Sequence, residues 1–239
     1  MHKFFAFMRK GILIMYKYDL HIHTAECDKY AWVGGAEIVR RYKDTGYDGL
    51  VITDHYESRM LDWFKDEIGT NDKEKIINRY LRGYYSARNE AEKIGFTVLC
   101  GAEVRFEGNI NDYLIYGLEE QDFYSLPLLN KLQNIEELSA VLPQNAIIVQ
   151  AHPFRNGMTV CSSNNIFGIE GYNGCTEKFR NEMAKMFASH YKKAITSGSD
   201  FHEISKLAKG GIETHKKINS PIDLVNILKS GDYKIIESY

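Results

Sequence analysis

The sequence of 239 residues is poor in cysteine, and none of its four cysteines forms a CxxC pair with another. This spacing argues against a disulfide framework and against a cysteine-rich zinc site. We therefore expect reduced thiols and a cytoplasmic location, where thiols are kept reduced. The sequence also lacks any run of roughly 20 apolar residues, the length that a membrane-spanning helix needs, so we expect no membrane span.

An excess of charge of either sign is absent as well. The 30 Lys and Arg residues nearly balance the 32 Asp and Glu residues, which gives a net charge of -2 and an isoelectric point near 6.5. Proteins that bind nucleic acid or anionic membranes through their surface usually carry a basic patch. The balance of charge therefore disfavours both partners, although it leaves room for a nucleotide substrate held by a metal site.

The chain has only four prolines and no low-complexity segment, internal repeat or long linker. We therefore expect residues 16–239 to form a single domain. Residues 1–15 carry short apolar pieces flanked by Lys and Arg, but these pieces are too short for a secretory signal and no cleavage site follows. Because Met15 would be a natural start just before the first strand, we expect an N-terminal extension without functional weight.

Short apolar runs alternate with longer segments of helical periodicity. This alternation predicts a parallel sheet covered by helices, either rolled into a barrel or left open. The helices are expected at 36–45, at 72–93, at 135–141 with Asn134 as its cap, after Thr176, and from Ser220 onward. The strands are expected at 18–22, 49–53, 96–100, 113–116, 146–150, 167–172, 194–197 and 233–236.

Five of the eight histidines lie at or just after the end of a predicted strand, namely His21, His23, His55, His152 and His202. In a parallel barrel the carboxyl ends of the strands meet at one face, so these side chains are expected to converge there. A single histidine at a strand end is often a hydrogen-bonded structural residue, but five at successive ends favour a shared site.

The spacing of these residues also indicates a metal site. His21 and His23 are two residues apart, so on a strand they share one face, and Asp200 and His202 repeat that spacing. Glu103 follows another strand, where a salt-bridged carboxylate is the alternative interpretation. Imidazole and carboxylate ligands together suit zinc, manganese or iron, and a carboxylate such as Glu103 can bridge two cations.

Five short motifs together resemble a known family. DLHIHT at 19–24, ITDH at 52–55, GAE at 101–103, AHP at 151–153 and SDFH at 199–202 are similar to successive motifs of the polymerase and histidinol phosphatase (PHP) family, and they occur in the family's order. The resemblance implies an α/β fold, a distorted (β/α)7 TIM-like barrel. It also implies a site for two or three divalent cations at the C-terminal ends of the strands.

The resemblance implies ligands for three cations: the first with His21, His23, Glu103 and Asp200, the second with Glu103 and His152, and the third with Asp28, His55 and His202. The family also gives the second cation a histidine from the strand after GAE, but the segment NDYLIYGLEE contains none. Asp112 lies on the same strand face as Leu114, the position that aligns with that ligand, and is a candidate substitute. A carboxylate that faces solvent at the start of the strand is the alternative.

For catalysis we single out Glu103, Asp200 and Arg155. Arg155 follows the AHP motif and could donate two hydrogen bonds to a phosphate, although a surface arginine that caps a loop is the alternative. Asp19 and Asp54 are candidates for orienting the imidazoles.

The resemblance and the ligand set together predict a hydrolase. We expect a metal-dependent phosphoesterase that cleaves a small phosphomonoester, similar to histidinol phosphate or a nucleotide, by metal-activated hydroxide. The alternatives are a phosphodiesterase or exonuclease, and a metal-binding module that has lost turnover.

Overall fold

The computed structural model describes residues 14–69, 72–162 and 164–238, so residues 1–13 of the expected N-terminal extension lie outside the described part. The strands form a five-stranded sheet in the order β11-β10-β1-β2-β4 and a six-stranded sheet in the order β3-β5-β6-β7-β8-β9. The strands are β1 (Tyr16–Ile22), β2 (Gly49–Ile52), β3 (His55–Tyr56), β4 (Thr97–Cys100), β5 (Ala102–Val104), β6 (Tyr113–Tyr116), β7 (Ile147–Gln150), β8 (Gly168–Asn173), β9 (Ala194–Gly198), β10 (Gly210–Thr214) and β11 (Lys234–Glu237).

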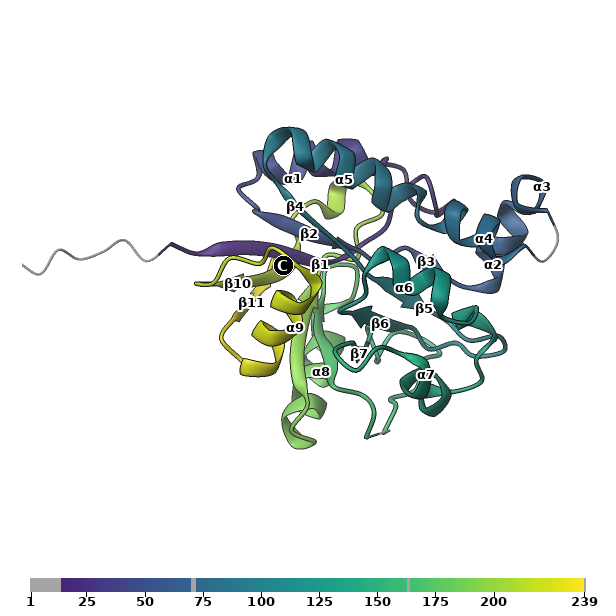
Figure 1. Cartoon of the computed structure of the whole chain (residues 1–239). Coiled ribbons are helices and arrows are strands. Elements are labelled where there is room, and N and C mark those ends of the chain that lie inside the picture. Colours follow the sequence, from purple (N-terminus) through teal and green to yellow (C-terminus); the bar gives the residue numbers. More distant parts are fainter. Residues whose placement is uncertain (1–13, 70–71, 163, 239) are drawn as a thin grey trace, which may run out of the picture.

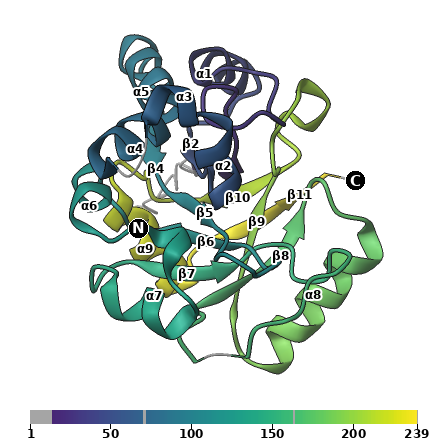
Figure 2. The same cartoon turned by 90° about the vertical axis from the view of Figure 1, so that its right-hand side faces the viewer.

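The two sheets meet along two lines. Along one line, β2 continues almost directly into β3 and β4 into β5, and each pair of neighbours is parallel. Along the other, a parallel bridge joins Ile22 to Phe201, and the backbone N–H of His23 donates to the carbonyl of Phe201 over 3.0 Å. Figure 2 shows the strands in the middle of the molecule with helices around them. The described residues thus form a mixed α/β fold, in which no single sheet closes into a barrel.

The expectation of a parallel sheet is wrong at several strands. β6 is antiparallel to both of its neighbours, β5 and β7, and β10 is antiparallel to β1 and β11. Only residues 105–112, without a helix, connect β5 to β6, and so short a connection joins strands that run in opposite directions. The sequence pattern indicates that strands are present but does not indicate their relative direction.

The helices lie on the outside of the sheets, with α1 and α5 side by side above β2 and β4 in Figure 1. As predicted, the side chains of Asn134 and Ser220 accept hydrogen bonds at the starts of α7 and α9. Among the described residues, none of the helices has the length and hydrophobicity to span a bilayer. The helices are α1 (Gly35–Asp44), α2 (Ser58–Trp63), α3 (Lys65–Ile68), α4 (Lys73–Tyr80), α5 (Arg82–Ile94), α6 (Glu120–Ser125), α7 (Ile135–Val141), α8 (Lys178–His190) and α9 (Pro221–Ser230), with 3-10 turns at Leu129–Lys131 and Ile204–Lys206.

The long helix expected at 72–93 is two helices, α4 and α5, separated at Leu81. Gly83 lies in the first turn of α5, and a Cβ atom there would come within 1.9 Å of the Thr24 hydroxyl and 2.6 Å of an Asp54 oxygen. Only glycine therefore allows the backbone to pass so close to the residues after β1 and β2. This close approach holds α5 directly against the segments that carry His23 and His55.

The helix expected after Thr176 is α8, which begins at Lys178. Its cap is Glu177, and the Thr176 hydroxyl donates to the Asn173 side chain instead. The large apolar residues Phe179 and Met183 are 58% and 45% exposed, whereas α8 buries its small residues, among them Ala184, against the sheet. Small side chains let a helix approach a sheet closely, so α8 packs against the sheet through its small residues and not through Phe179 and Met183.

An apolar cluster lies beneath the ends of the strands. It includes Leu99, Leu114 and Val149 from the strands, together with Leu224 and Val225 of α9. In the antiparallel ladder Leu114 is the direct partner of Glu103, so both side chains point to the same side of the sheet. The cluster therefore forms a buried apolar layer next to the polar residues at the strand ends.

Candidate metal centre

The five histidines at the strand ends meet in one place. The ring of His23 has its centroid 4.2 Å from those of His55 and His202, and the centroids of His21 and His152 are 5.8 Å apart. His21 is in β1, His55 is in β3, and His152 and His202 follow β7 and β9. The prediction that these residues converge at the carboxyl ends of the strands is confirmed.

Glu103, in β5, lies at the middle of the rings and is 1% exposed. Its Oε1 atom is 3.0 Å from His152 Nε2 and 3.4 Å from His21 Nε2. Its Oε2 atom is 3.3 Å from His23 Nε2 and 3.0 Å from His55 Nε2. One carboxylate thus faces two pairs of imidazoles, the arrangement expected of a group that bridges two cations.

Two aspartates complete the group. Asp28 Oδ2 is 2.6 Å from His55 Nδ1 and 3.3 Å from His202 Nε2. Asp200 Oδ1 is 3.5 Å from His23 Nε2 and 3.3 Å from His202 Nδ1. Both aspartates are buried, so their charges are held next to the imidazoles and away from water.

The residues of this centre fit divalent cations. Four overlapping sets of residues have ligand atoms within 4.8 Å of one another: His23, Asp28, His55 and His202; His21, His152 and Asp200; His21, His23 and Glu103; and Glu103, Asp112 and His152. Several buried atoms in these sets have no hydrogen-bond partner, namely His21 Nε2, both ring nitrogens of His23, and Glu103 Oε2. Buried polar atoms normally find a partner, and a cation would provide one for this group of atoms.

The charges of the centre suit cation binding. Burial alone would raise the pKa of Glu103, but His21, His55 and His152 together lower that pKa well below its usual value. Burial alone would also raise the pKa of Asp200, but His21 and Arg155 lower that pKa well below its usual value. Both carboxyl groups are therefore ionised, which is the form that binds metal.

Two of the predicted ligands have unusual backbone conformations. The φ angles of His152 and Asp200 are 26° and 54°, in the left-handed region that side chains with a Cβ rarely adopt. Such conformations cost about 1–3 kcal/mol each and persist where the surroundings enforce them, often at functional sites. The fold therefore maintains strain to aim these two side chains at the centre.

Arg155 also points toward the centre. Its Nη2 atom donates to Asp200 Oδ2 over 2.5 Å, and its Nη1 atom is 3.4 Å from His152 Nε2. The side chain is 37% exposed, so it lies between the buried ligands and solvent. The alternative interpretation of Arg155, a surface arginine that caps a loop, does not describe these contacts.

Asp112 is buried beside the centre. It is 1% exposed, and its Oδ2 atom is 3.9 Å from His152 Nε2. The alternative of a carboxylate that faces solvent is therefore wrong. However, Asp112 binds Arg105 with both oxygens, Oδ1 to Nε over 2.6 Å and Oδ2 to Nη2 over 2.5 Å.

The family comparison agrees with this geometry, because residues 19–230 match the PHP domain. The chain belongs to the PHP domain family. A comparison with curated proteins gives no match.

Solved structures with the same fold share little sequence with this PHP chain. A two-domain protein from Bacteroides vulgatus that contains a predicted PHP-like metal-dependent phosphoesterase is 16% identical, with a TM-score of 0.65 over 94% of this chain and 65% of that chain. PsfC from Pseudomonas syringae is 15% identical, with a TM-score of 0.64 over 94% and 92%. Endonuclease Q, in complex with a 27-mer duplex with an abasic lesion at the active site, is 14% identical, with a TM-score of 0.59 over 92% and 58%. Because the last is a DNA complex, the comparisons do not support the exclusion of nucleic acid.

Glu170 also belongs to the PHP centre, although it lies in none of the five sequence motifs. Its Oε1 atom is 2.8 Å from His21 Nδ1, and its Oε2 atom accepts from the backbone N–H of His152 and from Asn173 Nδ2. Glu170 therefore fixes the ring of His21 and the backbone of His152. One feature of the sequence could have indicated this role, because Glu170 is the only charged residue in the predicted strand FGIEGY.

Asp19 and Asp54 do not orient imidazoles, so that expectation is wrong. Asp19 accepts from the backbone N–H groups of His21 and Ser199. Asp54 accepts from both the backbone N–H and the hydroxyl of Thr24. These carboxylates hold the backbone of the ligand-bearing segments in place. Proximity to a histidine in the sequence does not distinguish this role from a contact with the imidazole ring.

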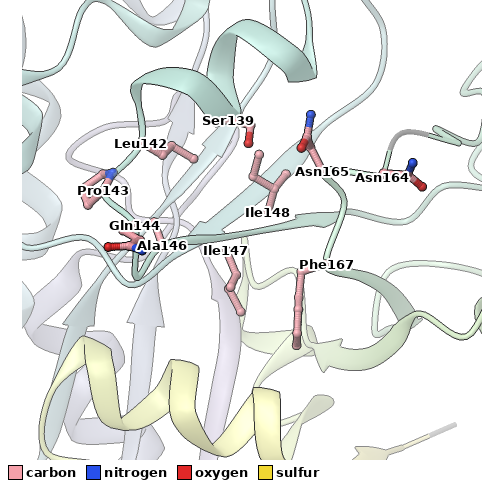
Figure 3. Close-up of a pocket in the computed structure, with 10 residues that line it drawn as sticks. All are labelled: Ser139, Leu142, Pro143, Gln144, Ala146, Ile147, Ile148, Asn164, Asn165 and Phe167. Atoms are coloured by element: carbon pink, nitrogen blue, oxygen red, sulfur yellow. The ribbon is translucent and has the colours of Figure 1, made fainter.

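A cavity of about 290 Å³ lies elsewhere, between α7, the start of β7 and the segment before β8 (Figure 3). Its lining includes Ser139, Ile147 and Phe167, and none of the described residues that line it is a histidine, a cysteine or a carboxylate. It lies at the amino ends of the strands, away from the PHP centre, and we assign it no chemistry.

Proposed function

We propose that this chain is a metal-dependent phosphoesterase that hydrolyses a small phosphomonoester. The observation that carries the proposal is Glu103, a buried carboxylate placed between two pairs of imidazoles. Membership of the PHP family and the phosphoesterase named in the Bacteroides structure support it.

The cations would be zinc, manganese or iron, because the donors are imidazoles and carboxylates. His21, His23, Glu103 and Asp200 would hold the first cation, Glu103 and His152 the second, and Asp28, His55 and His202 the third. When bound, such cations lower the pKa of water toward 7 and offset the charge of a phosphoryl group. Glu103 and Asp200, both ionised, would bring the negative charge that keeps the cations close together.

Arg155 would bind the phosphate of the substrate. Its guanidinium group is 37% exposed at the edge of the centre and already lies against the Asp200 carboxylate. Guanidinium groups bind phosphate with two parallel hydrogen bonds, so Arg155 could fix the orientation of the phosphoryl group and balance its charge. A phosphomonoester carries more charge than a diester, and a fixed cation at the edge of the centre favours it.

We also infer that the two sheets together form the distorted (β/α)7 barrel and that residues 16–239 are one domain. The bridge between Ile22 and Phe201 and the near-continuity of β2 with β3 support this inference. In such a barrel all the ligands belong to one rim, which explains why residues far apart in the sequence meet.

A phosphodiesterase acting on nucleic acid is the second candidate, favoured by the similarity in fold to Endonuclease Q. The purified chain should be loaded with Mn²⁺ or Zn²⁺, analysed for bound metal, and assayed with p-nitrophenyl phosphate and bis-p-nitrophenyl phosphate. Bound metal with hydrolysis of the monoester alone supports the proposal. Hydrolysis of the diester supports the second candidate, and bound metal without either hydrolysis indicates a module that has lost turnover.

A further inference from the structure

The four sets of candidate ligands differ in how far their ligand atoms already bind other groups of the protein. The unpartnered buried atoms are those of His21, His23 and Glu103. In the set formed by Glu103, Asp112 and His152, the Oε1 atom of Glu103 already lies 3.0 Å from His152 Nε2, and both oxygens of Asp112 bind Arg105. This set differs from the set formed by His21, His152 and Asp200, where Arg155 binds only one carboxylate oxygen of Asp200, Oδ2. At Asp112 a guanidinium group binds both carboxylate oxygens.

The position of Arg105 follows from the antiparallel pairing of β5 and β6. Val104 is the direct partner of Tyr113, so the next residues outward, Arg105 and Asp112, adjoin each other at the end of the ladder. The two parallel hydrogen bonds between them have the fork geometry that is specific to arginine. The pairing of the strands thus places the guanidinium group against Asp112.

A second carboxylate holds Arg105 from the other side. Glu57 Oε2 is 3.6 Å from Arg105 Nη1, and Glu57 is 3% exposed. With carboxylates on both sides, the guanidinium group is fixed in place. A divalent cation at Asp112 would have to displace this group or lie next to its positive charge, and both are unfavourable.

We propose that Arg105 takes the place of a divalent cation at the set formed by Glu103, Asp112 and His152. The second cation, which Glu103 and His152 would otherwise hold, is then absent, and the guanidinium group of Arg105 supplies permanent positive charge in its place. The centre binds cations only through its other sets. Arginine does not ionise water, because its own pKa is too high for it to act as an acid–base group. It can still attract a phosphoryl oxygen, so this part of the centre serves electrostatics and not the activation of water. The inference rests on the proposed metal-dependent function.

Metal content, and not activity, tests this inference. The wild-type chain, Arg105→Ala, Arg105→Lys, Asp112→Asn and the double variant Arg105→Ala/Asp112→Asn are loaded with Mn²⁺, desalted and analysed by mass spectrometry for manganese per chain. Arg105→Ala should gain about one manganese ion, because Asp112 becomes a free ligand. The double variant should lose that gain, and Arg105→Lys, which keeps the positive charge, should not gain an ion. Asp112→Asn alone should match the wild type.

Arg88→Ala is the matched control, since Arg88 pairs with Glu120 away from the centre and its loss should leave the manganese content unchanged.

Equal manganese content in the wild type and in folded Arg105→Ala would overturn the inference. So would a loss of manganese in Asp112→Asn, because Asp112 would then already hold a cation. If circular dichroism shows that Arg105→Ala does not fold, Asp112→Asn decides alone, with unchanged content in support and lower content against. A wild-type chain that binds no manganese would overturn both the proposed function and this inference.

Discussion

The centre has two unlike sides that share Glu103. On the histidine side, formed by His23, Asp28, His55 and His202, the side chains contact one another as imidazoles and carboxylates. No ion pair joins these four side chains to a lysine or arginine of the described part of the chain. On the arginine side, formed by Arg105, Asp112, His152 and Arg155, two guanidinium groups lie against the ligands.

The difference between the two sides indicates a division of tasks. Imidazole nitrogens and carboxylates attract cations, so the histidine side is suited to hold metal. Guanidinium groups attract anions and repel added cations, so the arginine side is suited to meet a phosphoryl group. A substrate phosphate placed between the two sides would be attracted by metal on one side and by arginine on the other.

The largest effect is expected at Glu103, because both sides depend on it. Glu103→Gln keeps the size of the side chain but removes the charge that faces His21, His23, His55 and His152. We expect hydrolysis of p-nitrophenyl phosphate by the manganese-loaded chain to fall by about a thousandfold or more, with less metal bound. Glu92→Gln, on the exposed face of α5, is the control. A folded Glu103→Gln chain with wild-type rates would remove Glu103 from the mechanism.

The histidine side is tested on its own by His55→Ala. His55 contacts Asp28 through one ring nitrogen and Glu103 through the other, so its loss opens the set of ligands. We expect lower metal content and a rate of phosphomonoester hydrolysis reduced by about a hundredfold. His190→Ala, at the exposed end of α8, should change neither quantity. Full metal content in His55→Ala would contradict the inference that the histidine side binds its cation through the imidazole of His55.

The arginine side is tested by Arg155→Ala. We expect kcat/KM for a phosphomonoester to fall by about thirtyfold, because a charged hydrogen bond to the phosphate is lost. Metal content should stay the same, and Arg155→Lys should recover part of the loss. Arg41→Ala, whose partner Glu37 lies on the surface of α1, serves as the control. If metal content falls together with the rate, Arg155 acts by holding Asp200, and the two sides are less separate than their contacts indicate.

The histidine side could be predicted from the sequence more fully than the arginine side. Its ligands occur in short motifs at strand ends, and the HxH pair at the end of β1 is predicted to share a face because of the geometry of an extended strand. Such patterns are local, so a sequence displays them directly. The alternation of strands and helices then places the motifs at one rim, which was sufficient to predict that His21, His55 and His202 would meet.

The arginine side depends on features that the sequence does not display. The pair Arg105–Asp112 requires β5 and β6 to be antiparallel, whereas the alternation of elements predicted parallel strands. The close approach of Gly83 in α5 to Thr24 is another contact between distant segments that the sequence does not display. Contacts between residues that are distant in sequence, or that depend on strand direction, need the folded chain.

Glu170 links a ligand that a local motif reveals, His21, to a contact that only the folded chain reveals. Its substitution gives the smallest effect that we expect. Its carboxylate is 149 residues from His21 in the sequence, yet it contacts the ring nitrogen that faces away from Glu103. Glu170→Gln keeps the side chain's size but weakens this contact, so the ring is oriented less firmly and is a less basic ligand. We expect manganese to bind about tenfold more weakly in a calorimetric titration, with the fold intact. Glu177→Gln, at the exposed start of α8, should bind as the wild type does. Unchanged affinity in Glu170→Gln would show that His21 is held by the strand alone, and the centre would then end at the residues that the sequence displays.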